Sequence, residues 1–352
     1  MIILLYVLLY ILPLFLIPYG ETYEIGKVIL AQLSIEVLFF WAVLKKNLIN
    51  LPNIRPLFIL ITIIFCLTLI QIIFFPTATS IFGNSHRSLG AYLLWHLLAL
   101  SIISASFVTK YIHNYFALLT LLLLLVVGLI GGGDETGRAF GTLGEPNSLA
   151  AAGIFLWPFT WTIPGWFVAF SLIFISGSRS GLLALAIQTL FLVLIKKFKV
   201  SLRSAIIWSL IILSTFYLIA FAEKSGVLEQ RAEIWRTSLV AGLHNPIIGG
   251  GFGNSESLIR QGAIKLGNSL RFQRVDDAHN FILNWWIQAG FAGVILLLYL
   301  LYFTLKNFIQ QKRSIELVIL LGLLTVMSFN PTSIVTLVGF WWLIGQGFDR
   351  NN

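Results

Sequence analysis

The sequence predicts an all-α integral membrane protein with about twelve transmembrane helices, because its composition and the spacing of its apolar runs agree. Hydrophobic residues make up 58% of the 352 positions, and charged residues make up only 11%. A soluble domain of this composition would have more apolar surface than it could bury, whereas a polytopic membrane protein has lipid to cover that surface. The apolar runs follow one another along the chain, and one long polar interval, residues 222–280, interrupts them.

The apolar runs are matched to a bilayer core of about 30 Å, which a helix of roughly 20 residues crosses. Pro158 and Pro164 interrupt the sixth and seventh runs, which are the least regular. The first run has no charged n-region and no small-residue cleavage site, so we expect a helix rather than a removed signal peptide. The expected spans lie near residues 2–18, 28–44, 57–75, 89–108, 112–130, 148–162, 164–176, 181–195, 204–221, 281–304, 315–328 and 332–347.

The net charge of +9 is divided unevenly between the two ends of the expected helices. If both termini are cytoplasmic, the inner connections hold a large excess of lysine and arginine, whereas charges balance in the outer connections. This positive-inside pattern places the long loop on the outer side of the membrane. Because topology explains the basicity, we expect no nucleic-acid partner. The chain then divides into nine helices (residues 1–221), a large outer loop (222–280) and three helices (281–352).

The outer loop contains a predicted amphipathic helix over residues 227–243, where apolar residues recur at helical spacing opposite a polar face. Such a helix is suited to lie along the membrane surface, with Trp235 at the level of the headgroups. Asn245 and Pro246 end the helix, and the glycines within residues 249–253 predict a flexible turn. No βαβ pattern surrounds these glycines, so they do not indicate a nucleotide site.

Single arginines stand among glycine, serine or asparagine in three short outer connections, at Arg87, Arg138 and Arg179. A basic residue in an outer loop opposes the topological bias, and an arginine fork between small residues suits the oxygens of a phosphate. Arg231 lies on the amphipathic helix that precedes the glycine-rich turn. These residues predict an anion site at the outer surface. The alternative is that the arginines reach lipid headgroups or pair with loop acids.

His279 is the candidate catalytic base, because it stands where the outer loop joins the next span. A neutral imidazole, with an ordinary pKa of about 6.5, accepts a proton. Asp276 and Asp277 precede the histidine and are expected to orient its ring, and Asn280 adds an amide at the mouth of the site. The alternatives are a histidine that caps the span through a backbone carbonyl, and a divalent metal site that includes both aspartates. Adjacent aspartates rarely both point inward, so we expect no metal.

Glu36 and His96 lie inside two expected spans, where ionisable side chains are costly and are functional candidates. Together with Gln71 they would suit a transporter. A structural hydrogen bond between Glu36 and His96 is the alternative, and we assign neither residue a role. Acidic residues available for a glycoside-hydrolase pair, none of which the sequence singles out, are Asp134, Glu135 and Glu145.

Several short segments resemble, in order, the successive motifs of the O-antigen ligase and polymerase superfamily. No single motif is long, so their order and the place of the large outer loop carry the resemblance. The family often has asparagine where Glu145 stands in this chain. The segments are residues 82–87 (FGNSHR), 140–150 (FGTLGEPNSLA), 176–181 (SGSRSG), 231–235 (RAEIW) with 245–246 and 249–253, 278–280 (AHN) and 288–293 (QAGFAG).

The resemblance implies a membrane glycosyltransferase of the GT-C type in the bacterial inner membrane, with its active site facing the periplasm. Members of this superfamily transfer glycans from undecaprenyl diphosphate without a cofactor or a metal. By this resemblance, Arg179 and Arg231 would hold the diphosphate and His279 would deprotonate the acceptor hydroxyl, and direct displacement would invert the anomeric centre. Accessory roles are expected for Arg87, Arg138, Asn147, Asp277 and Asn280.

The acceptor distinguishes three activities within this superfamily. A ligase attaches the glycan to lipid A core, a polymerase attaches it to another lipid-linked glycan, and a third activity attaches it to protein hydroxyls. We expect the ligase, with an undecaprenyl-diphosphate-linked donor, a lipid A core acceptor and the lipid bilayer as its partners. A membrane transporter is the alternative from another class of protein.

Overall fold

The computed structural model describes residues 2–17, 23–45, 55–106, 114–131, 133–160, 162–222 and 227–348. In these ranges the chain is helical and forms no β-strand. Each of the twelve expected apolar runs contains a helix. The first run is divided into α1 (Ile2–Tyr6), the π-helical turn η1 (Val7–Ile11) and the 3-10 turn η2 (Leu12–Leu14), and Pro13 stands in that last turn.

The remaining elements match the expected runs and the long loop between them. They are α2 (Ile25–Leu44), α3 (Arg55–Phe74), α4 (Ala78–Phe82), α5 (Ala91–Ser106), α6 (Asn114–Ile130), η4 (Gly141–Leu143), α7 (Pro146–Thr160), α8 (Ile163–Ser176), α9 (Arg179–Lys196), α10 (Leu202–Ala222), α11 (Val227–Gly242), α12 (Ser255–Leu266), η5 (Ser269–Phe272), α13 (Phe281–Gln310), α14 (Ser314–Met327) and α15 (Ile334–Gln346).

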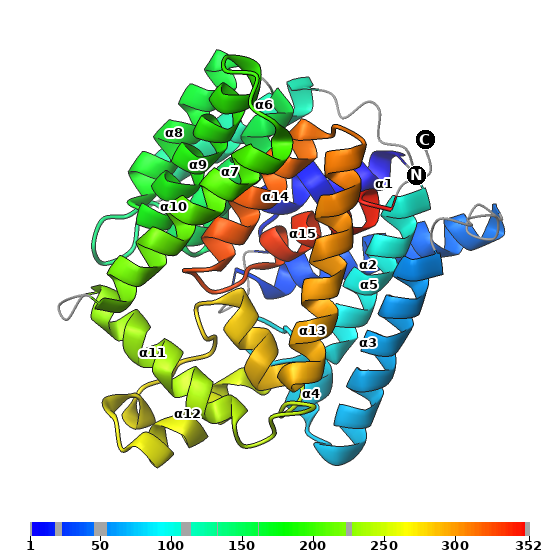
Figure 1. Ribbon diagram of the computed structural model, residues 1–352, viewed down its shortest axis with the longest axis vertical. Helices are drawn as coiled ribbons and strands as arrows, with labels where there is room; N and C mark the ends of the chain where they lie inside the picture. The colour runs from blue at the N-terminus through cyan, green and yellow to red at the C-terminus, as the bar shows by residue number, and fades with distance from the viewer. Residues whose placement is uncertain are drawn as a thin grey trace.

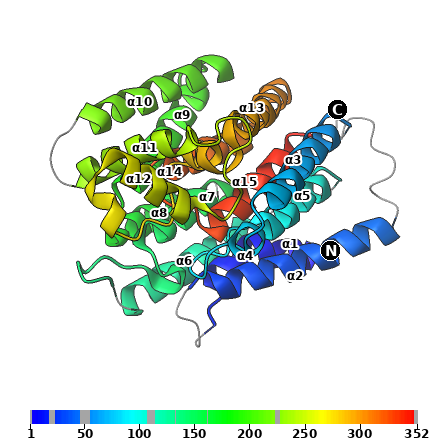
Figure 2. The same ribbon diagram turned by 90° about the horizontal axis from the view of Figure 1, so that it is seen from below.

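Four of the described helices, α2, α3, α9 and α13, are long and apolar enough to cross a membrane. Of the other apolar helices, two lie inside the protein. α15 is buried along its whole length, and it packs against α5, while α14 packs against α9 and α7. Figures 1 and 2 show α14 and α15 between a group formed by α7 to α10 and a group formed by α2, α3 and α5. The number of crossings and their direction stay predictions.

α11 and α12 pack against each other at one end of the bundle, which we call the α11/α12 end (Figure 1). The helix expected over residues 227–243 is therefore present as α11. The expected place of Trp235 is wrong, however, because its side chain is fully buried and its ring centroid lies 5.9 Å from that of Phe329. The part of α11 around Ile234 and Trp235 thus docks on the protein rather than on lipid headgroups, whereas Leu239 is exposed.

α13 is broken at Gly290, whose φ of 63° and ψ of −163° are open to glycine but strained for other residues. The loop of residues 246–251 fills the break with backbone hydrogen bonds. This loop donates two bonds to the carbonyls of residues 287–288 (3.0 and 2.9 Å) and accepts two from the N–H groups of residues 291–292 (2.7 and 3.0 Å). The glycine-rich turn is therefore ordered, and the prediction of a flexible turn is wrong.

Gln71, on α3, completes the hydrogen bonding at this break. Its side-chain amide donates to the carbonyl of Ile248 and to the carbonyl of Gln288, the latter at 2.9 Å. A carbonyl left without a partner inside a membrane protein costs free energy, so a buried amide at this place is explained by the break itself. Gln71 thus has a structural role, and it no longer favours a transporter.

We expect Gly290→Ala to destabilise the protein strongly, because an added Cβ would lie 2.5 Å from the backbone nitrogen of Gly249 and 2.6 Å from the carbonyl oxygen of Ile247. Backbone strain and overpacking together predict a loss of about 2–5 kcal/mol in the free energy of unfolding. Thermal unfolding in detergent measures the loss. Gly137→Ala is the matched control, since Gly137 has a φ of 78° but open space around it. Equal losses in the two variants would contradict a clash at the break.

Candidate functional site

Three arginines from distant parts of the sequence lie close together at the α11/α12 end. Arg138 belongs to the loop before α7, Arg179 is the first residue of α9, and Arg231 lies on α11. Burial lowers the pKa of the Arg231 guanidinium, and the positive charges of Arg138 and Arg179 lower it further. The three side chains are thus near enough to repel one another, and we call them the arginine cluster. Such a cluster attracts an anion.

Neutral oxygen atoms hold two members of the arginine cluster. Arg138 donates from Nε to the carbonyl of Ser176 at 2.8 Å and from Nη2 to Oδ1 of Asn147 at 3.2 Å. Arg231 donates from Nη2 to Oδ1 of Asn330 at 3.4 Å. These contacts orient the guanidinium groups and do not neutralise their positive charge.

No ion pair neutralises the arginine cluster within the part of the chain that the structure describes. Asp134 directs its carboxylate to the backbone N–H groups of Thr136 and Arg138, each at 3.0 Å, instead of to a guanidinium. The side chain of Arg179 is exposed. Since arginine stays protonated in proteins, the cluster carries a positive charge that a ligand can neutralise.

The start of α9 is joined to this cluster. Ser178 caps α9 by accepting the N–H of Gly181 at 3.2 Å, and its hydroxyl donates to Oδ1 of Asn147 at 3.0 Å. Two residues further along, the hydroxyl of Ser180 accepts a hydrogen bond from Nδ2 of Asn330 at 2.6 Å. The positive end of the α9 dipole therefore faces the same place as the arginine cluster, which favours an anion there.

His279 is held by its backbone, next to the cluster. Its φ of 52° is in the left-handed region, and Oδ1 of Asp277 accepts its N–H at 2.6 Å. The other carboxylate oxygen of Asp277 accepts hydrogen bonds from Nδ2 of Asn284 and from the N–H and hydroxyl of Thr332 (3.3 and 3.2 Å). Burial raises the pKa of the Asp277 carboxyl to about 6. Asp277 therefore fixes the turn that presents His279.

The imidazole ring of His279 is neutral at neutral pH. Burial is the main cause of its lowered pKa of about 4, and the positive charge of Arg231 adds to the effect. Among the described residues neither ring nitrogen makes a hydrogen bond, so the ring is available to a substrate. The expectation that Asp276 and Asp277 orient the ring is not met: Asp277 binds backbone and amide groups, and Asp276 binds Arg87.

Arg87 differs from the arginine cluster because carboxylates surround it. Its Nε donates to Asp276 at 2.7 Å, and its Nη2 donates to Glu145 at 2.9 Å. Burial lowers the pKa of this guanidinium, but the charges of Glu145 and Asp276 outweigh burial and raise the pKa overall. The structure thus matches the alternative in which a loop arginine pairs with acids. The Glu145 carboxylate serves this pair.

Asn280 and two residues that the sequence reasoning missed complete the frame of the site. Asn280 caps α13 by accepting the N–H of Leu283 at 3.0 Å, and it donates to the carbonyl of Ser328 at 3.1 Å. Its amide therefore holds the frame instead of facing the mouth of the site. Asn330 and Thr332, which contact Arg231 and Asp277 respectively, were missed. The polar sequence SFNPTS (328–333) between two apolar runs was the available signal.

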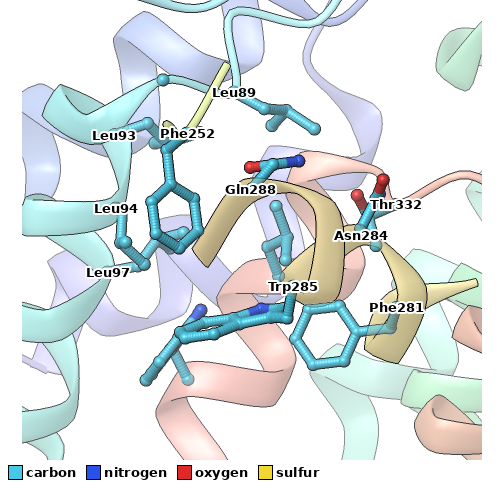
Figure 3. A pocket seen from close by; sticks show the side chains of 13 residues that line it. Leu89, Leu93, Leu94, Leu97, Phe252, Phe281, Asn284, Trp285, Gln288 and Thr332 are labelled. Carbon is cyan, nitrogen blue, oxygen red and sulfur yellow. The ribbon is translucent and has the colours of Figure 1, made fainter. Parts of the chain in front are cut away.

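An apolar pocket of about 50 Å³ lies behind Asp277, between α5, α13 and α15. Figure 3 shows Phe252, Phe281 and Trp285 in its wall, with Asn284 and Thr332 at one side. These last two residues donate to Asp277 from the pocket side. The pocket includes neither His279 nor Asp277 in its lining, so it is separate from the proton acceptor.

Glu36 and His96, to which no role was assigned, contact each other away from this site. Nε2 of His96 lies 2.9 Å from Oε1 of Glu36, and the hydroxyl of Tyr92 donates to the same oxygen at 3.2 Å. The contacts join α2 to the first half of α5. A hydrogen bond between the two residues is therefore present, and it connects two helices.

The residues considered for a metal site do not converge. Asp276 faces Arg87, and Asp277 faces Asn284 and Thr332, so the two carboxylates point to different partners. In the described ranges no three side chains of His, Cys, Asp or Glu gather in a group that would suit an ion. The arrangement of charges at this end instead suits an anion and a proton acceptor side by side.

Residues 165–298 match the family model described as O-antigen ligase. No curated protein matches the chain. The matched range begins in α8 and ends in α13, so it contains Arg179, Arg231 and His279 together with the whole loop that carries α11 and α12. The match and the apolar helices together point to a bacterial membrane protein of the glycosyltransferase kind. Over residues 165–298 this chain therefore carries the domain of the O-antigen ligase family.

Proposed function

We propose that this protein transfers a saccharide from undecaprenyl diphosphate to an acceptor hydroxyl at the periplasmic face of the bacterial inner membrane. The observation that carries the proposal is the arginine cluster, which has no carboxylate partner among the described residues and lies beside a neutral histidine. The family match supports a lipid-linked glycan and an acceptor as partners.

The arginine cluster fits the diphosphate of the donor. Arg179, Arg231 and Arg138 present three cations, and the start of α9 adds the positive end of a helix dipole. Charge increases on the diphosphate as it leaves, so cations placed there stabilise the transition state more than the ground state. An arginine fork also matches two phosphate oxygens at once.

His279 fits the second requirement of the reaction, a base for the acceptor. The acceptor hydroxyl oxygen attacks C1 of the donor sugar, and the bond between C1 and the diphosphate oxygen breaks. The hydroxyl proton passes to the neutral imidazole, and the bonding electron pair leaves with undecaprenyl diphosphate. Because the attack and the departure occur on opposite faces of C1, the anomeric configuration inverts.

We propose the ligase activity, with lipid A core as acceptor, ahead of a polymerase or a transfer to protein hydroxyls. The transporter alternative is weakened because Gln71, one of its three supporting residues, completes the backbone of α13. We also propose that both termini are cytoplasmic and that no cofactor or metal takes part in the transfer.

Reconstitution tests the proposal. Proteoliposomes that contain the purified protein, an undecaprenyl-diphosphate-linked glycan and an acceptor are expected to release undecaprenyl diphosphate and form the glycosylated acceptor, also in EDTA. Chain growth on the lipid-linked glycan itself would identify a polymerase. Loss of transfer in EDTA with recovery in a divalent ion would refute the metal-free mechanism, and donor-independent uptake of a solute would support the transporter.

In a plot of kcat/KM against pH, the fall on the acid side, the acid limb, should occur at an unusually low pH. Because the pKa of His279 is lowered to about 4, its ring stays unprotonated and able to accept a proton down to that pH. We expect kcat/KM for the donor, which reports the free enzyme, to fall only below about pH 4, and not near the ordinary value of about 6.5. Arg231→Gln should move the limb upward, because it removes a repelling cation. A limb near 6.5 in the wild type would contradict the buried base.

A further inference from the structure

A second cleft opens between the loop after α4 and the outer face of α12. Its volume is about 610 Å³, which is in the range of small-molecule sites. Most of its lining surface is apolar, yet hydroxyl, amide and guanidinium groups reach it, and Ile264 is its one aliphatic side chain. The polar residues on which the argument rests are Asn84, Ser85, Glu256, Arg260, Gln261 and Arg274.

The charge of this cleft is positive. Arg274 pairs with Glu256 at 3.1 Å, whereas Arg260 forms no ion pair within the described residues. An adjoining cleft of about 400 Å³ shares Arg260, Arg274 and Glu256, and it adds Arg271. One carboxylate thus faces three guanidinium groups across the two clefts. The exposed side chain of Gln261 also makes no hydrogen bond inside the described part of the chain, so it is available to a ligand.

Short stretches of backbone join the cleft to His279. Arg274 precedes Asp276 and His279 in one segment, and Asp276 binds Arg87 at 2.7 Å. On the other wall, Oδ1 of Asn84 accepts the N–H of Arg87 at 2.8 Å. The cleft and His279 are therefore held to the same pair of loops. A molecule that fills the cleft would therefore contact the loops that carry Arg87 and Asp276, a few residues along the chain from the proposed base.

We propose that this cleft binds the saccharide of the acceptor through an anionic substituent, a phosphate or a carboxylate, that Arg260 and Arg274 neutralise. The proposal rests on the proposed function, because it assigns the acceptor to this cleft and the donor diphosphate to the arginine cluster. Amides and hydroxyls such as those of Gln261 and Ser85 suit the hydroxyl groups of a sugar, and the unpaired guanidinium suits an acidic group on it.

Direct binding tests this assignment without the need for transfer. The purified full chain, in nanodiscs of neutral phosphatidylcholine, is titrated with glucose 6-phosphate, glucuronic acid and glucose by saturation-transfer NMR, and the affinity of inorganic phosphate is measured by its competition against glucose 6-phosphate. We expect the two acidic sugars to bind at least about tenfold more tightly than glucose or inorganic phosphate. Equal binding of glucose and glucose 6-phosphate would overturn the assignment, and so would equal binding of inorganic phosphate.

Variants then separate the cleft from the donor site. Arg260→Gln should raise the Kd of glucose 6-phosphate by about tenfold or more and leave the Kd of the lipid-linked donor unchanged. Lys265→Gln, an exposed residue on the same helix outside both clefts, is the matched control and should change neither value. Gln261→Ala should weaken the binding of glucose 6-phosphate but not the binding of inorganic phosphate. Unchanged sugar binding in Arg260→Gln would refute the proposal.

A lipid headgroup is the other source of an anionic group at this surface. If nanodiscs that contain phosphatidylglycerol abolish the binding of glucose 6-phosphate, the cleft recognises headgroups and the acceptor assignment fails. Failure of the proposed function gives a different result: the wild type would then bind acidic sugars in an Arg260-dependent way and would show no transfer from the lipid-linked donor.

Discussion

His279→Ala is expected to abolish measurable saccharide transfer while the protein still inserts and folds. Removal of a general base typically costs 10²–10⁴-fold in rate, on the order of 3–5 kcal/mol of transition-state stabilisation. The structure adds a reason for a large effect, since the ring is neutral, buried and free of protein hydrogen bonds within the described residues. Initial rates in proteoliposomes at saturating donor measure the loss.

The backbone of His279 requires a second variant. Its φ of 52° is strained for alanine, whereas asparagine tolerates the left-handed region. His279→Asn should therefore match the wild type in thermal stability and still lack activity. His244→Ala, at an exposed histidine of the same loop, should keep full activity. Activity in His279→Asn within a factor of a few of the wild type would exclude the ring as the base.

Arg231→Gln is expected to weaken donor binding more than any other substitution in the arginine cluster. Arg231 is partly buried and is close to both other arginines and to His279. A charge-assisted hydrogen bond to a phosphate contributes about 1.5–3 kcal/mol, so the donor Kd should rise by about 10- to 150-fold. Fluorescence titration with a lipid-linked donor analogue measures the change.

The same substitution should not destabilise the empty protein. The positive charges of Arg138 and Arg179 oppose that of Arg231, so its removal relieves a repulsion. We expect the Tm without donor to stay the same or to rise, and the extra Tm conferred by donor to shrink. Arg203→Gln, in the first turn of α10 and outside the cluster, serves as the control. If the donor Kd is unchanged in Arg231→Gln, the diphosphate does not bind at the arginine cluster.

Composition and apolar runs were sufficient to place the helices but not the contacts between distant segments. Twelve apolar runs became helical, and the polar interval contained the expected α11. The break in α13 was not predicted, because it depends on a loop and on Gln71, both far from Gly290 in the sequence. A glycine in an apolar run is compatible with an unbroken helix, so periodicity alone does not reveal such a break.

The arginines of the site also show that local sequence does not reveal contacts between distant segments. Arg87 and Arg138 stand in similar sequence surroundings, yet Glu145 and Asp276 surround Arg87, while Arg138 meets only neutral oxygens. Residues separated by long stretches of sequence decide which arginine keeps a free charge. Local spacing therefore selected candidates of the right type, and the tertiary contacts distinguish a structural ion pair from a cluster without carboxylates.

Both ends of the segment of residues 252–277 are attached to nearly the same turn of α13. Before it, Gly250 and Gly251 donate to the carbonyls of residues 287–288, and after it the N–H of Ala278 donates to Oδ1 of Asn284 at 3.0 Å. An excursion that leaves and rejoins one helix at fixed points tolerates changes of length and sequence between them. Residues 252–275 can therefore vary in length and sequence, and the molecule that they select can vary with them, while Asp276, Asp277 and the contacts beside α13 stay constant.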